Sequence, residues 1–385
     1  MLACLRFRVE HSRGRSYPEP DHPYRNAFQR DRDRVVHSRA FRRLEAKTQV
    51  FAPGLSDHFR NRLTHTIEVA QIARTVANVL GLDEDLTEAL ALAHDIGHPP
   101  FAHAGEEELN RQMERFNDRF EHNLHALRIV ESFEQRYARF PGLNLTFEVR
   151  EGIVKHSRDF GPWERQEVEP YLPGLRPPLE AQLIDLADEV AYNTADLDDA
   201  FSAGMLSAED VALSIPLYRA IHEAVETQYP GATSRERFYE ALRQLIDALV
   251  SGLIEGTVKQ AREASVGNVD EVRAVPGRLA AFTPEAAEAS RLLKGFLYAK
   301  VYASEALGVH RQRSMAMIAE LFQFFLDYPD RLPQSYREQT LAEPAHRVVC
   351  DYIAGMTDVF FRRTYEQTIG PIALETVHLR SHPSQ

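Results

Sequence analysis

The chain has 385 residues, 44% of them hydrophobic, and its 57 acidic and 45 basic residues give a net charge of −12. This composition excludes a wholly disordered chain, and the acidic balance argues against a general nucleic-acid binder. The sequence has no apolar run of membrane-spanning length and no apolar stretch of a secretory signal near its start, so we expect no membrane partner. Its two cysteines, Cys4 and Cys350, exclude a disulfide framework, and we expect a cytoplasmic protein.

Basic residues are concentrated near the N-terminus. From Arg6 to Lys47 there are 12 basic and six acidic residues, a net charge of +6, which leaves −18 on the rest of the chain. A basic segment on an acidic body favours a phosphate-rich partner or an acidic neighbouring subunit. The alternative is a solvated helix face on which arginines form ion pairs with acidic residues of the same chain.

Helical periodicity dominates the sequence in chain order. Over 62–81, apolar residues recur at steps of three or four and predict a helix that ends at Gly81 and buries Leu63, Ile67, Ala70, Ala73, Ala77 and Leu80. The next helix opens at Asp83 as N-cap and ends at Gly97. Further amphipathic helices are predicted over 104–118, 121–138, 178–200, 207–228, 234–262, 284–303, 306–327 and 345–369.

The scarcity of alternating apolar and polar residues predicts an all-α protein with at most one short hairpin. We predict a basic N-terminal segment over 1–27, a large helical core over 28–200, and a helical C-terminal portion over 201–385 packed on that core. No internal repeat and no low-complexity linker separates these parts.

Histidine and carboxylate residues are dense between 58 and 125. His94 and Asp95 are adjacent near a helix end, and together an imidazole and a carboxylate suit a divalent ion such as Mg²⁺, Mn²⁺, Co²⁺ or Fe²⁺. Taken alone, a His-Asp pair is weak evidence because the chain has 16 histidines. P-loop, Rossmann, nucleophile-elbow and zincin motifs are all absent from the sequence.

Three further features strengthen the prediction of a metal site. His65 lies in the helix that precedes His94, among apolar residues. Asp188 lies within a strongly apolar helix, where a carboxylate must be paired, hydrogen-bonded or bound to a cation. Tyr192 and Asp196 follow at steps of four, which places them along one face of the helix with Asp188.

These residues carry a resemblance to a known family. His65, His94-Asp95 and Asp188 match the H…HD…D signature of the HD phosphohydrolase superfamily. More narrowly, the chain resembles the deoxyguanosinetriphosphate triphosphohydrolase-like proteins, a family of dNTP triphosphohydrolases, from Ser12 to about Asp358. The matching strings are RLTHTIEVAQIAR, ALAHDIGHPPFAHAGEEEL, FEHNLHALRIV, LEAQLIDLADEVAYNTADLDDA and DYIAGMTD. The resemblance implies a helical HD phosphohydrolase core over 28–200.

The resemblance implies an enzyme that converts a dNTP and water into a deoxynucleoside and inorganic triphosphate. It also implies four ligands for a divalent metal ion, in the first place Mg²⁺ or Mn²⁺: His65, His94, Asp95 and Asp188. For His65, the alternative is a core histidine bonded to a carbonyl group.

By similarity, His103 and Glu106 form the catalytic pair. They are three residues apart and share a helix face if a helix starts after Pro100. A carboxylate beside an imidazole raises its basicity, so His103 is expected to protonate the 5′-oxygen, and a role in activating water stays open. The alternative is that His103 is the N-cap of this helix, and that Glu106 only stabilises the first helical turn through its negative charge.

The resemblance also implies six substrate-binding residues: Gln49, Arg62, His98, His122, Tyr192 and Asp196. His98 and His122 would line the triphosphate site. For each of them, the alternative is a structural role in capping a helix or in packing. The guanidinium of Arg62 would hold a phosphate.

The other three residues would contact the nucleoside end of the substrate. Asp196 would accept from the 3′-hydroxyl, while Tyr192 would contact phosphate and crowd a 2′-hydroxyl, which favours deoxyribose. The amide of Gln49 would meet the base without proving a preference for guanine.

Several alternatives stay open at this point. The resemblance adds a homo-oligomer and, in some members, a dNTP or nucleic-acid effector. The nearest rival function is another HD phosphohydrolase: a guanosine tetraphosphate hydrolase, a cyclic-nucleotide phosphodiesterase or a 5′-nucleotidase. A second rival is a non-catalytic regulator that senses nucleotides or binds nucleic acid. Matches outside the metal quartet, and the presence of every expected residue, argue against both.

Overall fold

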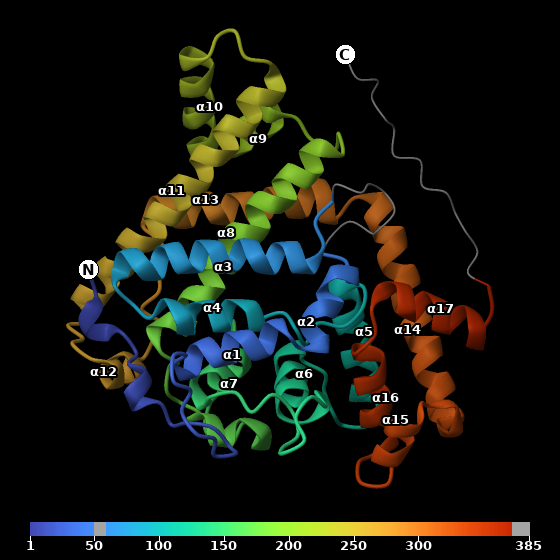
Figure 1. The fold of residues 1–385 in the computed structure, drawn as a ribbon. Helices are drawn as coiled ribbons and strands as arrows, with labels where there is room; N and C mark the ends of the chain where they lie inside the picture. The colour runs from blue at the N-terminus through green and yellow to red at the C-terminus, as the bar shows by residue number, and fades with distance from the viewer. Residues whose placement is uncertain (50–58, 372–385) are drawn as a thin grey trace.

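The computed structural model describes residues 1–49 and 59–371, and within them the fold is all-α (Figure 1). The α-helices are α1 (Ala27–Val36), α2 (Arg39–Arg43), α3 (Arg62–Leu80), α4 (Glu84–Ala93), α5 (Ala102–Glu114), α6 (His122–Arg128), α7 (Phe147–Val154), α8 (Leu179–Ser202), α9 (Ala208–Ser214), α10 (Pro216–Gln228), α11 (Ser234–Glu263), α12 (Val269–Ala274), α13 (Pro284–Leu297), α14 (Glu305–Asp327), α15 (Gln334–Gln339), α16 (Ala345–Ala354) and α17 (Asp358–Thr368). Two π-helical turns, η4 (Ile129–Phe133) and η6 (Tyr298–Tyr302), extend α6 and α13. Extended pairing in the described residues is limited to three isolated bridges, so the prediction of an all-α protein is confirmed.

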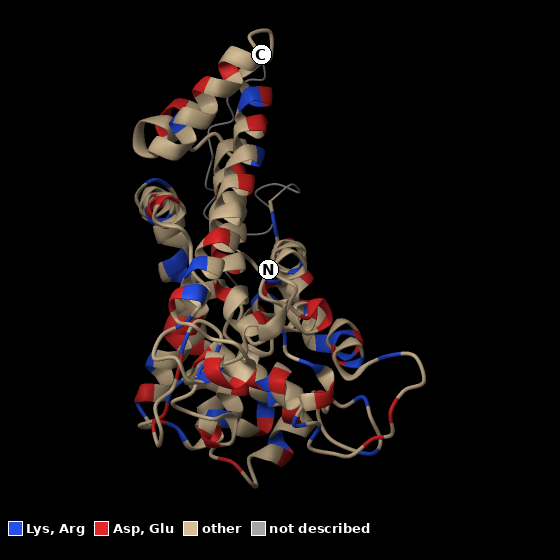
Figure 2. Ribbon diagram, turned by 90° about the vertical axis from the view of Figure 1, so that its left-hand side faces the viewer, with Lys and Arg blue, Asp and Glu red and all other residues tan. Residues whose placement is uncertain are grey.

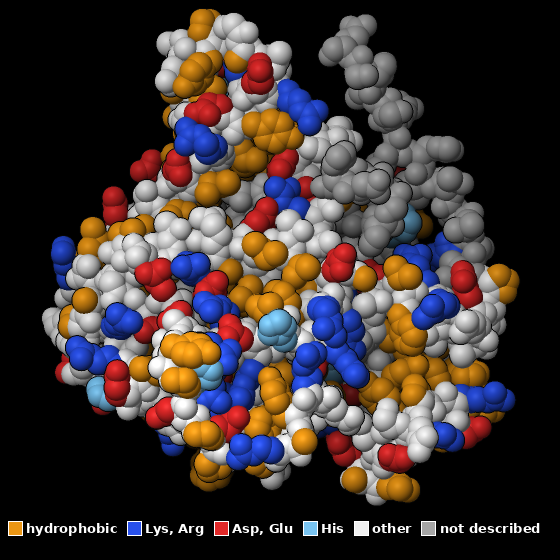
Figure 3. Space-filling model, in the orientation of Figure 1, with side chains coloured by type: hydrophobic (Ala, Val, Ile, Leu, Met, Phe, Trp, Pro, Cys, Tyr) orange, Lys and Arg blue, Asp and Glu red, His pale blue; other side chains and the backbone are white. Residues whose placement is uncertain are grey.

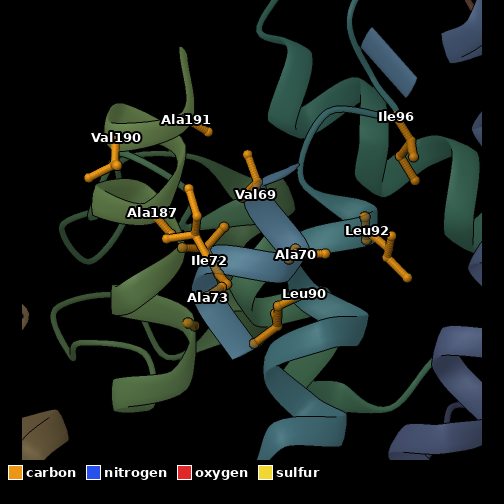
Figure 4. Close-up of a cluster of buried hydrophobic side chains, with 14 of the residues drawn as sticks. Val69, Ala70, Ile72, Ala73, Leu90, Leu92, Ile96, Ala187, Val190 and Ala191 are labelled. Carbon is orange, nitrogen blue, oxygen red and sulfur yellow. The ribbon is translucent and has the colours of Figure 1, made fainter. Parts of the chain in front are cut away.

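Helix α3 lies at the centre of the molecule and packs on α4 and α8. It begins at Asn61, whose side chain accepts a hydrogen bond from Thr64 N, and it ends at Gly81, whose φ of 80° is left-handed. Its buried face faces Leu90 of α4 and Ala187 of α8 (Figure 4). Each fully buried Val, Ile or Leu there contributes about 1.5–3 kcal/mol of burial free energy.

One core prediction for α3 is wrong. Ile67 is 54% exposed, whereas Val69, Ile72 and Val76 are buried. Successive residues turn by about 100° around a helix, so Ile67 lies about 200° from Val69 and faces solvent. Ala70, Ala73, Ala77 and Leu80 are buried as predicted.

Three predicted helices are shorter than the sequence pattern indicated. The helix expected over 207–228 is divided at Ile215, because Pro216 takes the first position of α10, where its missing N–H costs nothing. The helix expected over 345–369 is divided after Ala354, where Thr357 caps α17 by accepting from Phe360 N. The helix expected over 121–138 ends at Phe133 with its last turn in π geometry.

The C-terminal half contributes two groups of helices. Helices α9, α10 and part of α11 project from the top of the molecule in Figure 1, while α14 to α17 lie along its right side. The second group has a hydrophobic core of its own, which joins Leu321 and Phe322 of α14 to Leu109 and Met113 of α5. Helix α5 therefore links the C-terminal helices to the region of the His-Asp pair.

Several arginines of the basic stretch over 6–47 form ion pairs within the chain. Arg15 lies 2.5 Å from Asp31, Arg34 bonds Glu19 at 2.7 Å, and Arg32 approaches a glutamate of α4 at 3.1 Å. Basic and acidic residues are interspersed over the molecule in Figures 2 and 3. These contacts favour the intramolecular ion pairs over a phosphate-rich partner for this segment.

The predicted three-part division stays a prediction, but its boundaries can be located in the structure. Residue 27 opens α1, and residue 200 lies within the last turn of α8. Leu5 and Phe7 of the first part are buried in the hydrophobic cores. Within 1–49 and 59–371, no helix is long and apolar enough to cross a bilayer.

Candidate active site

Local sequence features place His65 and the His-Asp pair close together. The Asn61 cap starts α3 so that His65 lies one turn into the helix. Helix α4 ends at Ala93, and the turn that follows carries His94 and Asp95. Gly97 is required in this turn, because a Cβ at that position would lie 2.0 Å from the carbonyl oxygen of His122.

Three donor atoms from α3, the α4 terminus and α8 converge. His65 Nε2 lies 2.8 Å from Asp188 Oδ1, and His94 Nε2 lies 3.8 Å from the same oxygen. One ligand atom from each of these three residues lies within 4.8 Å of the others. Nδ1 of His94 is 2.6 Å from Ala91 O and therefore carries the proton, which leaves the Nε2 lone pair facing the cluster.

The electrostatics of this cluster suit a cation. Burial raises the pKa of the Asp188 carboxyl, but hydrogen bonding and charge from His65, with the charge of His94, outweigh it and lower that pKa to about 2. Burial lowers the pKa of His94, which favours the neutral imidazole that a metal ion needs. Nε2 of His94 is buried without a partner among the described residues, so the site fits a divalent ion.

Asp95 lies between this cluster and a second one. Its Oδ1 is 3.5 Å from His94 Nε2 and 3.1 Å from His98 Nε2, while its Oδ2 accepts from Arg62 Nη1 at 2.6 Å. Burial raises the pKa of Asp95, but the nearby cationic groups hold it well below its usual range. The predicted phosphate ligand Arg62 is thus bonded to a predicted metal ligand.

The second cluster comprises His98, Glu106 and His122, whose ligand atoms also lie within 4.8 Å of one another. Glu106 Oε1 lies 2.7 Å from His122 Nδ1 and accepts from His122 N at 3.0 Å. The His98 and His122 rings stack with their centroids 3.9 Å apart. Burial raises the pKa of Glu106, but the charges and hydrogen bonds of the histidines outweigh it, so Glu106 is ionised.

The geometry differs from the predicted pairing of His103 with Glu106. Nδ1 of His103 lies 3.8 Å from Glu106 Oε2, beyond hydrogen-bond distance, and its side chain is 85% exposed. Glu106 is instead hydrogen-bonded to His122 of α6. The sequence placed His103 and Glu106 on one helix, but it carried no local signal for the contact with α6.

Tyr192 and Asp196 lie along α8 beyond Asp188. The hydroxyl of Tyr302 in η6 donates to the carboxylate of Asp196, which is buried. The hydroxyl of Tyr192 is buried without a partner among the described residues, and Lys294 Nζ lies 5.6 Å from its ring centroid. Burial raises the pKa of Asp196 to about 7 despite the hydrogen bond from Tyr302.

Gln49 is the last described residue before 50–58, which lie outside the described part of the chain. Its Oε1 is buried without a partner among the described residues. The predicted contact of Gln49 with a base stays a prediction.

Comparisons with known proteins agree with this arrangement. A model of the HD domain matches residues 62–193, and a model of the phosphohydrolase-associated domain matches residues 280–367. A deoxyguanosinetriphosphate triphosphohydrolase-like protein of Geobacter metallireducens is 43% identical over 371 residues, covering 95% of both chains. Proteins of the same name from Geobacter sulfurreducens and Azoarcus sp. are 44% and 45% identical and cover 95% and 92% of this chain. The chain belongs to the deoxyguanosinetriphosphate triphosphohydrolase-like family.

As a member of this family, the protein is an HD-domain phosphohydrolase. HD domains are metal-dependent hydrolases, and the convergent donors of His65, His94 and Asp188 are a group that can hold a divalent ion. Imidazole and carboxylate donors together accept several divalent ions, among them Mg²⁺, Mn²⁺, Co²⁺ and Fe²⁺.

Sequence reasoning missed two polar residues of this triphosphohydrolase-like site. His156 is buried beside His94, with 5.1 Å between the ring centroids, and its Nδ1 lies 2.8 Å from Asp185 Oδ1. Tyr302 bonds Asp196 from more than a hundred residues away. The only local signal for His156 was its position directly after the buried apolar residues of α7.

Proposed function

We propose that the protein hydrolyses deoxynucleoside triphosphates, dGTP or several dNTPs, to deoxynucleoside and inorganic triphosphate in a metal-dependent reaction. The observation that carries this proposal is the pair of adjoining His/carboxylate clusters joined through Asp95. One cluster fits a divalent cation, and the other holds two imidazoles and an ionised carboxylate that can move a proton. The names of the relatives support the same substrate class.

In this proposal, His65, His94, Asp95 and Asp188 hold the divalent ion. When bound, the ion supplies Lewis acidity to a phosphate oxygen of the substrate. Arg62 is buried beside it, and its Nε has no partner among the described residues, which supports a role in holding phosphate.

The second cluster then serves the leaving group. Water attacks the α-phosphorus in line, the bond from that phosphorus to the 5′-oxygen breaks, and the leaving alkoxide needs a proton. We assign this proton to His103, whose exposed side chain is free to approach a substrate. Glu106 is ionised and bonded to His122, and its negative charge stabilises the protonated imidazole of His103. The attacking water releases its proton to solvent, and the alternative role of His103 is to accept that proton.

The sugar end of the substrate is assigned to α8. Asp196 would accept from a 3′-hydroxyl, and the ring of Tyr192 would crowd a 2′-hydroxyl. Tyr302 supports this assignment because it already donates to the Asp196 carboxylate from η6.

The products decide between this function and its rivals. We would incubate the protein with each dNTP, singly and mixed, with Mg²⁺ or Mn²⁺, and separate the products by chromatography. Deoxyguanosine and intact triphosphate are expected from dGTP. dGMP with pyrophosphate, or dGDP with phosphate, as the initial product would overturn the proposal. Hydrolysis of guanosine tetraphosphate, a cyclic nucleotide or a nucleoside monophosphate in place of dNTPs would favour another HD phosphohydrolase.

Assembly and regulation stay predictions. The ion pairs Arg15–Asp31 and Arg34–Glu19 lie within the basic stretch and leave its net charge of +6 unchanged. The prediction of a homo-oligomer therefore rests on this charge asymmetry and on the family resemblance. Light scattering at micromolar protein, with and without dNTPs, is expected to give a multiple of the 43.9 kDa chain mass. Adding a second dNTP or single-stranded DNA to the hydrolysis assay tests for an effector.

A further inference from the structure

A third histidine lies beside the predicted metal ligands. His156 follows α7, and its imidazole is buried. Its Nε2 lies 3.9 Å from Asp188 Oδ2, whereas His65 contacts the other oxygen of that carboxylate. The remaining polar neighbour of the ring is Asp185, which lies 2.8 Å from Nδ1.

The orientation of His156 is fixed from several sides. Asp185 accepts from the backbone N–H of Ser157 at 2.9 Å, and its other oxygen accepts from Arg278. The carbonyl oxygen of His156 accepts from Asn123 Nδ2 at 2.7 Å. The charge of Asp185 is thus shared with Arg278, and its Oδ1 fixes the direction in which Nδ1 of His156 points.

This arrangement is typical of metal-binding histidines. Such a ring gives one N–H to a carboxylate and directs its other nitrogen toward the ion. Two donors that each lie about 2.1 Å from one ion are separated by at most about 4.2 Å, and the distance from His156 Nε2 to Asp188 Oδ2 is within that limit. That distance is also too long for a hydrogen bond, so a structural partnership with Asp188 does not explain the position of the ring.

We propose that His156, oriented by Asp185, is a further imidazole ligand of the divalent ion. The inference rests on the metal site of the proposed function and adds a residue to it. It assigns to the centre three histidines: His65, His94, whose Nδ1 is hydrogen-bonded to Ala91 O, and His156, whose Nδ1 lies 2.8 Å from Asp185 Oδ1.

Metal affinity of the full chain tests this proposal without measuring turnover. Mn²⁺ is titrated into the protein while the free ion is followed by electron paramagnetic resonance. We expect His156→Gln and Asp185→Asn each to weaken Mn²⁺ binding by about 10- to 100-fold. The matched control is His222→Gln, a buried histidine of α10 that stacks on Tyr218 and is expected to leave the affinity unchanged.

A spectrum of the Co²⁺-loaded protein separates a ligand from a residue that only supports the fold. Proton NMR should show three exchangeable, strongly shifted imidazole N–H signals in the wild type and two in His156→Gln. Circular dichroism establishes that each variant is folded, and Asp185→Asn provides the test if His156→Gln is not. Two signals in the wild type together with wild-type Mn²⁺ affinity in the folded variants would overturn the role of His156 alone. A wild-type protein that binds neither ion would overturn the metal site as well.

Discussion

The carboxyl group of Asp196 changes its charge in the middle of the physiological pH range. Burial raises its pKa to about 7, so it is mostly a neutral acid at pH 6 and mostly a carboxylate at pH 8. The carboxylate can accept from the Tyr302 hydroxyl with one oxygen and from a substrate hydroxyl with the other, whereas the neutral acid presents one of its oxygens as a donor. The protonation state of this one residue is therefore expected to govern binding of the sugar.

We predict that KM for dGTP falls roughly tenfold as pH rises from 6 to 8, following the ionised fraction of Asp196. Asp196→Asn has no ionisable group, so its KM should be higher and much flatter over this range. Steady-state kinetics across the range check the prediction, with the exposed Asp247→Asn as control. A KM in Asp196→Asn that falls as steeply as in the wild type would assign the pH dependence to another group.

His103 is predicted to act on the leaving group and not on the metal. His103→Ala should lower kcat by about 10²–10⁴, the usual contribution of a general acid or base. Mn²⁺ affinity should stay at the wild-type value, because the exposed ring contacts none of the predicted ligands of the ion. His37→Ala, an exposed histidine at the end of α1, is the control. Near wild-type turnover in the metal-loaded variant would make His103 structural.

At the scale of elements, the C-terminal helices hold the start of α5. Asp358 opens α17 and is buried, and its carboxylate accepts from Thr48 N at 3.0 Å, from the Thr48 hydroxyl and from Phe101 N at 3.1 Å. Phe101 has a left-handed φ of 62° immediately before α5. The nearby ammonium of buried Lys47 donates to the carbonyl oxygens of His98 and Ala354. Residues of the C-terminal portion therefore position the helix that carries His103 and Glu106.

Asp358→Ala is predicted to impair the active site from a distance. It leaves two backbone N–H groups of the junction without their acceptor, at a cost of about 1–3 kcal/mol each. Turnover should fall at least tenfold because α5 loses an anchor, and KM should rise because Asp358 also holds Thr48, the neighbour of the predicted substrate residue Gln49. Urea unfolding and kinetics measure both effects, with the exposed Glu366→Ala of the same helix as control. Lost stability with wild-type kcat would show a purely structural role.

The sequence alone predicts those helices whose buried face and end residues are determined by nearby positions in the chain. Helix α3 runs from Asn61 to Gly81 as the apolar period and the glycine indicate, and α8 begins within one residue of its prediction. The helix breaks before Pro216 and at Thr357 also have local signals, namely the proline and the capping threonine. The apolar period continues across both breaks and therefore predicts one long helix in each case. His156, Tyr302 and the contact of Glu106 with His122 depend on packing between distant segments. A helical period cannot register such contacts.

At the scale of the whole molecule, the predicted ion links segments that are remote in the sequence. His65, His94 and Asp188 come together only when α3, α4 and α8 are packed, so the unfolded chain has no preformed site. An ion that binds only the folded state stabilises it by an amount that depends on its concentration relative to Kd. At 100 times Kd the stabilisation is about 2.7 kcal/mol.

Chelation is therefore predicted to lower the Tm of the protein by several degrees, and Mn²⁺ should restore it. Differential scanning calorimetry of the protein with a chelator, and then with Mn²⁺ in excess, measures the shift. Asp188→Asn removes an anionic ligand and should abolish most of this difference in Tm between the chelated and the Mn²⁺-loaded protein. An identical Tm with and without saturating Mn²⁺ would contradict binding at this site.

The π-helical turn η6 makes the active site sensitive to the length of the chain. A π turn accommodates one more residue than an α turn, and η6 places Tyr302 where its hydroxyl reaches Asp196. Deleting one residue of the turn, such as Lys300, would return it to α geometry. The wider turn that positions Tyr302 opposite Asp196 would then be lost. Substitutions in this turn should therefore be tolerated where a deletion is not, since only a deletion moves Tyr302 away from α8.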